Sequence, residues 1–183
     1  MLEFYPINFN KKESMANTTN DIVIQKKTDN NFIILYLNIS KITDNIYLSG
    51  INGASSMNKL NEHNIKCILN CTKNELNYFE NNNDMTYMRI PINDTTDQHI
   101  EQYFDSTYKF IEKCISENKN VLVHCHAGIS RSATILIAYF MRKNNISYQE
   151  AYDFIKNKRS IINPNFDFVN ALKNFKPDEL QTR

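Results

Sequence analysis

The chain has 183 residues, of which 42% are hydrophobic and 22% are charged, and its formal net charge at pH 7 is +1. These values are typical of one globular domain with a substantial buried core. A net charge so close to zero provides no overall field that would draw the protein onto nucleic acid or an anionic membrane, so we expect neither as a partner. Any attraction for an anion must therefore be local.

The cysteine spacing and the apolar runs indicate whether the protein binds a metal and where in the cell it is located. Cys67, Cys71, Cys114 and Cys125 show neither the CxxC pairing nor the Cys/His spacing of a zinc site, so we expect no metal and no cofactor. The first 13 residues lack the pattern of a secretory signal, and the longest apolar run, 133–141, is too short to cross a bilayer. These features predict a reducing location, cytoplasmic or nuclear, where thiols stay free.

Composition divides the chain into three parts. Residues 1–39 are predicted to form a polar N-terminal extension, partly disordered, because they are rich in Asn and Lys and show no clear period. Within it, the apolar segment 32–39 (FIILYLNI) predicts an extra strand that docks on the domain, the alternative being a segment that docks on a partner. Residues 40–176 are predicted to form the folded domain, and residues 177–183 a C-terminal tail.

From residue 40 onward, short apolar segments typical of strands alternate with segments of helical period. The predicted strands are 46–48, 66–70, 86–92 and 121–123, and the predicted helices are 99–118, 132–144, one that begins at Ser147 with Glu150 in a capping box, and one that begins at Asn163 with Pro164 in its first turn. This alternation predicts an α/β fold with a mostly parallel central sheet flanked by helices on both faces.

Residues 121–134, with the sequence VLVHCHAGISRSAT, carry the chemistry. A buried strand is followed by a tight loop and then by a helix, whose N-terminus offers free amide groups and a partial positive charge. These amides are expected to surround a tetrahedral dianion. The residues predicted to bind the phosphate in this way are His126, Ala127, Gly128, Ile129, Ser130 and Arg131.

Cys125 is the predicted nucleophile of this loop. A thiol beside a helix N-terminus and a cation ionises more readily than a free thiol, so the pattern predicts a thiolate that attacks phosphorus without a separate base. Arg131 lies six residues later, and its planar guanidinium is suited to pair two phosphate oxygens at once. The hydroxyl of Ser132 is expected to stabilise the departing sulfur, and His124 is expected to orient the loop.

The motif HCHAGISRSAT resembles the signature of the dual-specificity protein phosphatases, a branch of the cysteine-based protein tyrosine phosphatase superfamily. Within that branch it most resembles the mitogen-activated protein kinase phosphatases, and the segments 43–50 (TDNIYLSG) and 158–172 (KRSIINPNFDFVNAL) extend the resemblance over about residues 40–176. The resemblance implies a protein tyrosine phosphatase-like fold. The 39 residues that precede the domain are too few for the N-terminal kinase-docking module of those relatives, so we expect that module to be missing.

The resemblance also implies an activity and its partners. A protein of this class hydrolyses phosphotyrosine and phosphoserine or phosphothreonine through a phospho-cysteine intermediate. The expected partners are phosphorylated protein substrates, with a protein kinase among the candidates. Asn165 resembles the asparagine of the family's Pro-Asn pair, which implies that it supports the phosphate loop.

Hydrolysis also needs a proton for the leaving oxygen and then a base to activate water, and one carboxylate can serve both steps. Asp94 and Asp97 are the candidates. Asp94 directly follows the predicted strand 86–92 and stands where the resemblance places the acid, so it is the predicted general acid. Asp97 lies just before the predicted helix 99–118, where an acidic residue more often interacts with the helix dipole.

Two other functions remain open at the level of sequence. One is a phosphatase for a non-protein phosphate, such as a phosphoinositide, a glucan or an RNA 5′ end. The loop lacks the lysine that relatives acting on inositol lipids tend to carry. A phosphate-binding module without activity is disfavoured because such relatives usually lose the cysteine, whereas Cys125 is present.

Two further features have a simple structural interpretation beside a functional one. Lys156, Lys158 and Arg159 form a basic cluster that is expected to be a solvated helix end, or else to attract acidic residues of a substrate. Cys71 is expected to be a small core residue. Its functional alternative is a partner that traps an oxidised Cys125 as a disulfide.

Overall fold

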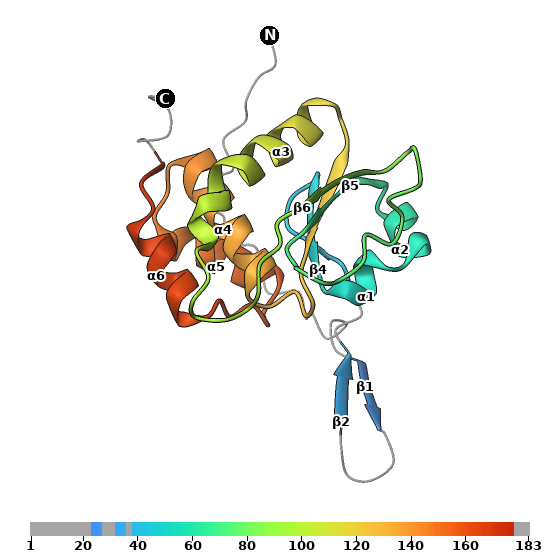
Figure 1. Ribbon diagram of the computed structural model, residues 1–183, viewed down its shortest axis with the longest axis horizontal. Coiled ribbons are helices and arrows are strands. Elements are labelled where there is room, and N and C mark those ends of the chain that lie inside the picture. The colour runs from blue at the N-terminus through green and yellow to red at the C-terminus, as the bar shows by residue number, and fades with distance from the viewer. Residues whose placement is uncertain (1–22, 27–31, 36–37, 178–183) are drawn as a thin grey trace.

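A five-stranded sheet forms the centre of the protein in the computed structural model, which describes residues 23–26, 32–35 and 38–177. The strand order is β3-β4-β7-β5-β6, in which β4, β7, β5 and β6 run parallel and β3 is an antiparallel edge strand (Figure 1). The strands are β3 (Ser40–Lys41), β4 (Ile46–Ser49), β5 (Ile65–Asn70), β6 (Thr86–Arg89) and β7 (Asn120–His124). This arrangement confirms the predicted mostly parallel sheet.

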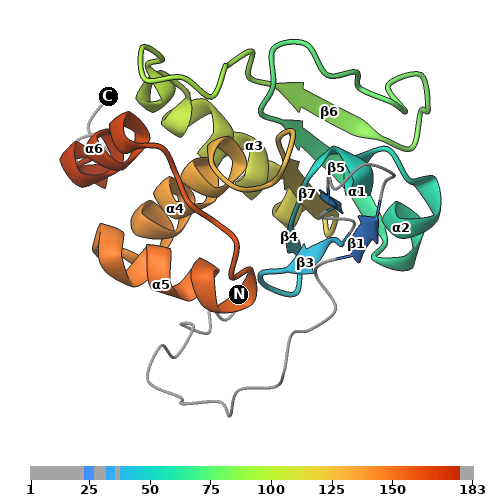
Figure 2. The ribbon, with the colours of Figure 1, turned by 90° about the horizontal axis from the view of Figure 1, so that it is seen from below.

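Helices cover both faces of the sheet, as predicted. One face carries the short helices α1 (Ile51–Ala54) and α2 (Met57–Glu62). The other face carries α3 (Phe104–Ser116), preceded by the 3-10 helix η1 (Ile100–Tyr103), and then α4 (Arg131–Asn144), α5 (Tyr148–Lys158) and α6 (Phe166–Asn174). In the view of Figure 2, α4 lies among α3, α5 and α6, with the sheet to one side.

Alternation along the central strand β7 explains why both faces must be covered. Val121 and Val123 belong to the larger apolar core, under the four long helices, whereas Leu122 belongs to a smaller core together with Leu60 of α2. All three side chains are fully buried. Successive side chains of a strand point to opposite faces, so an uninterrupted apolar strand is stable only inside a covered sheet.

Helix α4 is the helix that fixes the others. Its residues from Ser132 to Met141 are all buried, in agreement with the prediction that this almost uniformly apolar segment forms a buried helix. It packs on α3, α5, α6 and the sheet. Because the N-terminus of α4 directly follows the turn after β7, this packing also fixes where that turn lies.

The apolar segment near the N-terminus does form a strand, but not in the main sheet. β2 (Phe32–Leu35) pairs with β1 (Val23–Lys26) in a separate antiparallel sheet of two strands. The remainder of the predicted polar extension, residues 1–22, 27–31 and 36–37, and residues 178–183 of the predicted tail lie outside the described residues.

The predicted beginning of the last helix was wrong. Helix α6 has Asn165, not Asn163, as its N-cap, and the Asn165 side chain accepts a hydrogen bond of 3.0 Å from the amide of Phe168. Asn163 is used elsewhere, because its amide donates to the carbonyl oxygen of Ile129 at 2.9 Å. The capping box at Ser147 and Glu150, in contrast, is confirmed in both of its hydrogen bonds.

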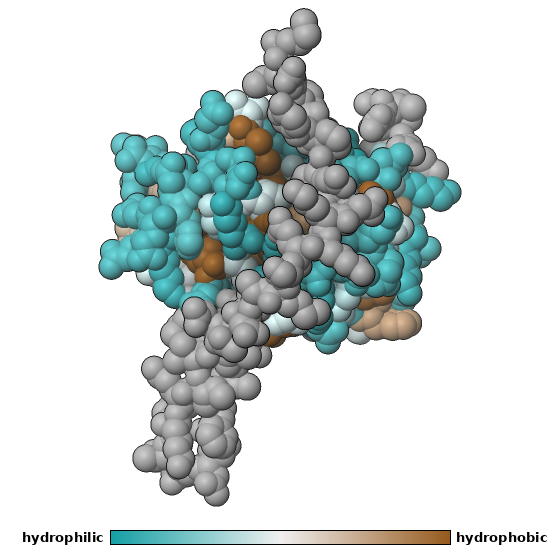
Figure 3. All heavy atoms as spheres, turned by 180° about the vertical axis from the view of Figure 1, so that it is seen from behind, coloured by the Kyte–Doolittle hydropathy of each residue, from teal (hydrophilic) through white to brown (hydrophobic). Residues whose placement is uncertain are grey.

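Where described residues are visible on the face opposite that of Figure 1, the surface is mostly hydrophilic, with scattered apolar spots (Figure 3). Among the described residues, no helix is both long and apolar enough to span a membrane.

We predict that Ser147→Ala lowers the free energy of unfolding by about 1 kcal/mol, because it removes the side-chain acceptor that caps the first turn of α5. Urea denaturation would measure this change. Ser116→Ala is the matched control, since its exposed hydroxyl donates only to the carbonyl oxygen of Lys113 in its own helix. Equal losses in the two variants would contradict a specific role of the cap.

Candidate active site

The loop 125–131, here called the phosphate loop, begins at the carboxyl end of β7 and ends at the first residue of α4. β7 is the middle strand of the sheet, between β4 and β5. Open α/β sheets place ligands beyond the carboxyl ends of such strands. Cys125 is the first residue of the loop, and only 1% of its surface is exposed.

Two donors converge on the Cys125 sulfur. The amide of Gly128 donates to Sγ at 3.2 Å, and so does the hydroxyl of Ser132, also at 3.2 Å. Hydrogen bonds of this kind stabilise negative charge on sulfur, and they fix the direction of the side chain. The sulfur therefore lies at the base of the loop, as a nucleophile of this class requires.

The carbonyl oxygens of residues 126–130 in the phosphate loop all have partners outside its centre. The Ile51 amide donates to the carbonyl of residue 126, and the Arg159 guanidinium donates to those of residues 127 and 128. The Asn163 amide donates to the carbonyl of residue 129, and the amide and hydroxyl of Thr134 donate to that of residue 130. In a trans peptide the C=O and the following N–H point in opposite directions. The amides of residues 127–131 are therefore turned toward the centre of the loop, which is the arrangement that binds an oxyanion.

Two glycines allow the loop to approach β4 this closely. Gly128 has φ = +68°, and a Cβ there would lie 2.5 Å from the carbonyl carbon of Ser49. A Cβ on Gly50 would lie 2.9 Å from the carbonyl oxygen of His126. Any side chain at either position would push the loop away from the end of β4, so both positions require glycine.

Arg159 is the residue of the site whose role the sequence did not indicate. It was expected to be part of a solvated basic cluster, but it is 1% exposed. Its Nε donates to the carbonyl of Gly128 at 2.9 Å and its Nη2 to that of Ala127 at 3.3 Å, while Nη1 donates to Ser40 Oγ at 3.0 Å. The basic run 156–159 gave no signal that Arg159 turns inward, because a helix end with two preceding lysines has the same sequence pattern when every basic side chain is exposed.

Arg131 extends from the first turn of α4 into the site. Its side chain is 13% exposed, and Nη1 donates to the carbonyl of Ile92 at 3.3 Å. Its buried Nε makes no hydrogen bond within the described residues, although it lies 3.6 Å from Asp94 Oδ2. An unsatisfied buried donor is costly, and an oxygen of a bound phosphate would be a suitable acceptor for it.

Asp94 lies at the edge of the phosphate loop, five residues after the end of β6. Its Oδ1 accepts from the Ser130 hydroxyl at 2.7 Å and from Asn165 Nδ2 at 3.0 Å. The Asn165 amide in turn donates to Ser130 Oγ at 3.2 Å. The structure thus brings together the predicted acid, the predicted arginine and the predicted supporting asparagine.

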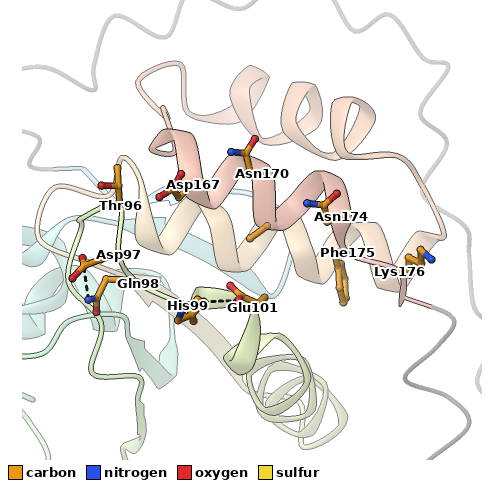
Figure 4. Close-up of a pocket in the computed structure, with 11 residues that line it drawn as sticks. Thr96, Asp97, Gln98, His99, Glu101, Asp167, Asn170, Asn174, Phe175 and Lys176 are labelled. Atoms are coloured by element: carbon orange, nitrogen blue, oxygen red, sulfur yellow. Dashed lines mark hydrogen bonds and ion pairs between the residues drawn. The ribbon is translucent and has the colours of Figure 1, made fainter.

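Asp97 lies elsewhere. It accepts hydrogen bonds from the Thr95 hydroxyl at 2.5 Å and from Gln98 at 3.3 Å, and both hold its pKa below the usual value of an aspartate. Its side chain lines a pocket of about 570 Å³ between this segment and α6, which no residue of the phosphate loop lines (Figure 4). Of the two candidate aspartates, Asp94 is the one in contact with the loop.

The two histidines of the motif differ in environment. His124 is buried, and burial lowers its pKa to about 4, so the ring is neutral at neutral pH; its Nδ1 lies 3.3 Å from the carbonyl oxygen of Cys125. The His126 side chain is 65% exposed, and its Nδ1 lies 2.7 Å from Glu75 Oε1. Among the described residues, no cluster of three His, Cys, Asp or Glu side chains could hold a metal ion.

Cys71 directly follows β5, whose Asn70 is paired with His124 of β7, so Cys71 and Cys125 leave the sheet from neighbouring strands. Its amide donates to the His124 carbonyl at 2.8 Å. Burial is the main reason that the pKa of its thiol is raised well above the ordinary value, so the sulfur is a neutral thiol. All four cysteines are free. The disulfide between Cys71 and Cys125 stays a prediction.

Comparison with known proteins identifies the family of this chain. Residues 46–178 match the family model of the dual specificity phosphatase catalytic domain. Human dual specificity protein phosphatase 9 is 42% identical over 135 residues, which cover 74% of this chain and 35% of that protein. Human dual specificity protein phosphatase 7 is 44% identical over 130 residues, which cover 71% of this chain and 31% of that protein.

Solved structures give the same assignment. The crystal structure of DUSP15 matches with a TM-score of 0.70 and 33% identity, covering 75% of this chain and 86% of that chain. The chain belongs to the dual specificity phosphatase family, as its motif predicted. It spans about a third of the length of the curated relatives named above.

We predict that Arg159→Lys weakens the binding of inorganic phosphate about tenfold, because one ammonium group cannot hold two loop carbonyls in the way that a planar guanidinium does. Calorimetric titration with phosphate measures the affinity, and thermal unfolding reports separately on stability. Ser40→Ala is the matched control, since it removes one partner of Arg159 without altering the loop. Loss of stability without loss of phosphate affinity would contradict a role in positioning the loop.

Proposed function

We propose that this protein hydrolyses phosphate monoesters of tyrosine and of serine or threonine in protein substrates, through a phospho-cysteine intermediate. The observation that carries the proposal is the phosphate loop, in which the inward amides and Arg131 surround the position above the Cys125 sulfur. The relatives support it, since those cited by name are dual specificity protein phosphatases. The side chains that vary within the loop include no lysine, which favours a protein over an inositol lipid as the substrate.

The first step is attack of the Cys125 sulfur on phosphorus. An S–P bond forms as the P–O bond to the substrate oxygen breaks, and the three remaining phosphate oxygens stay in contact with the loop amides and the Arg131 guanidinium. These donors are already oriented by the surrounding structure, so little reorganisation is needed in the transition state. Asp94 at the edge of the loop donates a proton to the leaving oxygen, which departs as a neutral alcohol or phenol.

The second step returns the enzyme to its initial state. Asp94, now ionised, accepts a proton from a water molecule that attacks the phosphorus of phospho-cysteine. The S–P bond breaks, inorganic phosphate forms, and the electron pair returns to the sulfur. The Ser132 hydroxyl and the Gly128 amide, each 3.2 Å from Sγ, stabilise the thiolate as it departs. The sum of the two steps is hydrolysis of one monoester by one water molecule.

This reaction indicates the class of partner but not the individual proteins. Phosphorylated proteins are the proposed substrates, and a protein kinase among them stays a prediction.

We predict that Cys125→Ser lowers kcat at least ~10³-fold while phosphopeptide binding is largely kept, because the amides and Arg131 remain in place. Steady-state kinetics and calorimetric binding of a phosphotyrosine peptide measure the two effects. Cys71→Ser is the matched control, as it replaces a neighbouring buried thiol whose sulfur takes no part in the proposed steps. Activity of Cys125→Ser close to that of the native enzyme would remove Cys125 as the nucleophile.

We also predict that Asp94→Asn slows hydrolysis of phosphoserine and phosphotyrosine peptides ~10²–10⁴-fold, because their leaving oxygens need a proton. The loss on p-nitrophenyl phosphate should be much smaller, since nitrophenolate leaves without one. Comparing kcat on the three substrates tests this difference. Asp97→Asn serves as the control, and a larger loss there than in Asp94→Asn would assign the acid to the other aspartate.

A further inference from the structure

The large apolar side chains that lie exposed between residues 38 and 177 are Leu76, Tyr78 and Phe166, with exposed fractions of 67%, 41% and 73%. Isolated apolar residues on a surface are ordinary. The feature that distinguishes Leu76 and Phe166 is their position, because each directly follows a residue that contacts the phosphate loop. Glu75 contacts His126 at one end of the loop, and Asn165 contacts Ser130 at the other.

Leu76 is held in place on a well-anchored loop between β5 and β6. The carbonyl oxygen of Glu75 accepts from Arg89 Nη2 at 2.6 Å and from Asn70 Nδ2 at 3.2 Å. The side-chain oxygen of Asn77 accepts from the same two donors, at 3.1 Å and 2.9 Å. Both neighbours of Leu76 are therefore fixed by the fully buried Asn70 and by Arg89, while the apolar side chain between them points to solvent.

Phe166 is held in a similar way at the start of α6. The Asn165 side chain, which caps the helix, also donates to Asp94, and its amide donates to Ser130. Phe168, two residues later, is fully buried in the core. The exposure of Phe166 is thus not the fraying of a helix end, because the turn that carries it is anchored on both sides.

We propose that Leu76 and Phe166 form an apolar rim of the active site that binds bulky apolar side chains flanking the phosphorylated residue of a polypeptide substrate. This inference rests on the proposed function. The phosphate loop itself recognises only the phosphate, so any preference among polypeptides must come from contacts outside it. Because Glu75 and Asn165 contact opposite ends of the loop, we expect a polypeptide that crosses the mouth of the site to meet Leu76 on one side and Phe166 on the other. Burying apolar surface there favours apolar partners.

The ordered backbone at Leu76 and Phe166 favours binding at the rim. An ordered apolar residue that meets a ligand loses little conformational entropy on binding, so more of the burial free energy appears as affinity. The backbone that carries each residue is already ordered by hydrogen bonds of its neighbour, which also contact the catalytic elements, through Glu75 to His126 and through Asn165 to Asp94. Binding energy at the rim is therefore realised next to the reacting phosphate.

Two phosphotyrosine peptides of equal charge test the rim, one with leucine at the two positions on each side of the phosphotyrosine and one with serine there. The measurement is the ratio of kcat/KM for the leucine peptide to that for the serine peptide. For the native enzyme we expect a ratio of at least about 10, as burial of one or two apolar side chains provides. Leu76→Ser and Phe166→Ser should each lower this ratio about threefold to tenfold.

Tyr78→Ser is the matched control. It removes an exposed aromatic ring from the loop that carries Leu76, but the ring packs beside Phe79, and neither neighbour of Tyr78 contacts the phosphate loop in the hydrogen bonds described. The ratio should stay unchanged in this variant. The proposal of an apolar rim is overturned by a native ratio near 1. It is also overturned if neither Leu76→Ser nor Phe166→Ser alters the ratio, or if Tyr78→Ser lowers the ratio equally.

Activity on p-nitrophenyl phosphate separates failure of the rim from failure of the proposed function. If both peptides are hydrolysed at equal rates, the proposed protein phosphatase activity is supported and the rim is contradicted. If p-nitrophenyl phosphate is hydrolysed but neither peptide is, the proposal of a protein substrate is contradicted, and the rim is contradicted with it. Sedimentation of the native protein and of both serine variants tests whether the surface instead binds a second copy of the chain. If the native protein is a dimer that either variant converts to a monomer, and the peptide ratio is unchanged, the surface serves self-association and the proposal is overturned.

Discussion

The orientation of the peptide groups in the phosphate loop is the constraint on which the rest of the site depends. Five consecutive carbonyl oxygens, from His126 to Ser130, accept hydrogen bonds from α1, from Arg159, from the segment before α6 and from α4. A hydrogen bond of this kind contributes only about 1 kcal/mol net, but a buried carbonyl left without its donor costs roughly 1–3 kcal/mol. The amides can point inward only because each carbonyl has a partner on the outside, so elements distant in sequence jointly determine the shape of the binding site.

The same contacts explain how a nearly neutral protein would bind a dianion under the proposed function. Positive charge is concentrated at one point, by the N-terminus of α4, by the Arg131 side chain and by Arg159 behind the loop. The acidic member of the site, Asp94, is held beside Arg131 by Ser130 and Asn165. The Ser130 hydroxyl donates to Asp94 and accepts from the Asn165 amide. The acid, the phosphate loop and the start of α6 are therefore positioned together. A displacement of any one of them would alter the other two.

The sequence predicted those parts of the structure that are set by local pattern. The apolar segment 121–123, the buried helix after it and the capping box at Ser147 each follow from residue type and spacing, and each is present. The motif around Cys125 predicted the loop because glycine, arginine and serine stand at fixed offsets from the cysteine. Asp94 and Asn165 were identified through the resemblance to a family, and the structure then showed that they contact each other.

Features that depend on contacts between distant segments were not predictable in this way. Arg159 turns inward because Ser40 and the carbonyls of Ala127 and Gly128 surround it, and nothing in the residues next to it shows this. Asn163 resembled an N-cap, but its amide is bound to Ile129 and the cap is two residues later. The exposure of Leu76 depends on how Arg89 and Asn70 fix the residues on either side of it. In each case a tertiary hydrogen bond decides the outcome.

Direct detection of phosphate on Cys125 during turnover tests the central claim, that the loop holds a phosphate against this sulfur. The native enzyme is mixed rapidly with p-nitrophenyl phosphate, whose good leaving group makes breakdown of the intermediate the slower step, and the reaction is quenched within milliseconds. Mass spectrometry of the tryptic peptide that spans residues 120–131 then locates the group. The account predicts one added phosphate on Cys125, in an amount that falls as substrate is exhausted. Turnover at the full rate without phosphate on this peptide would contradict it.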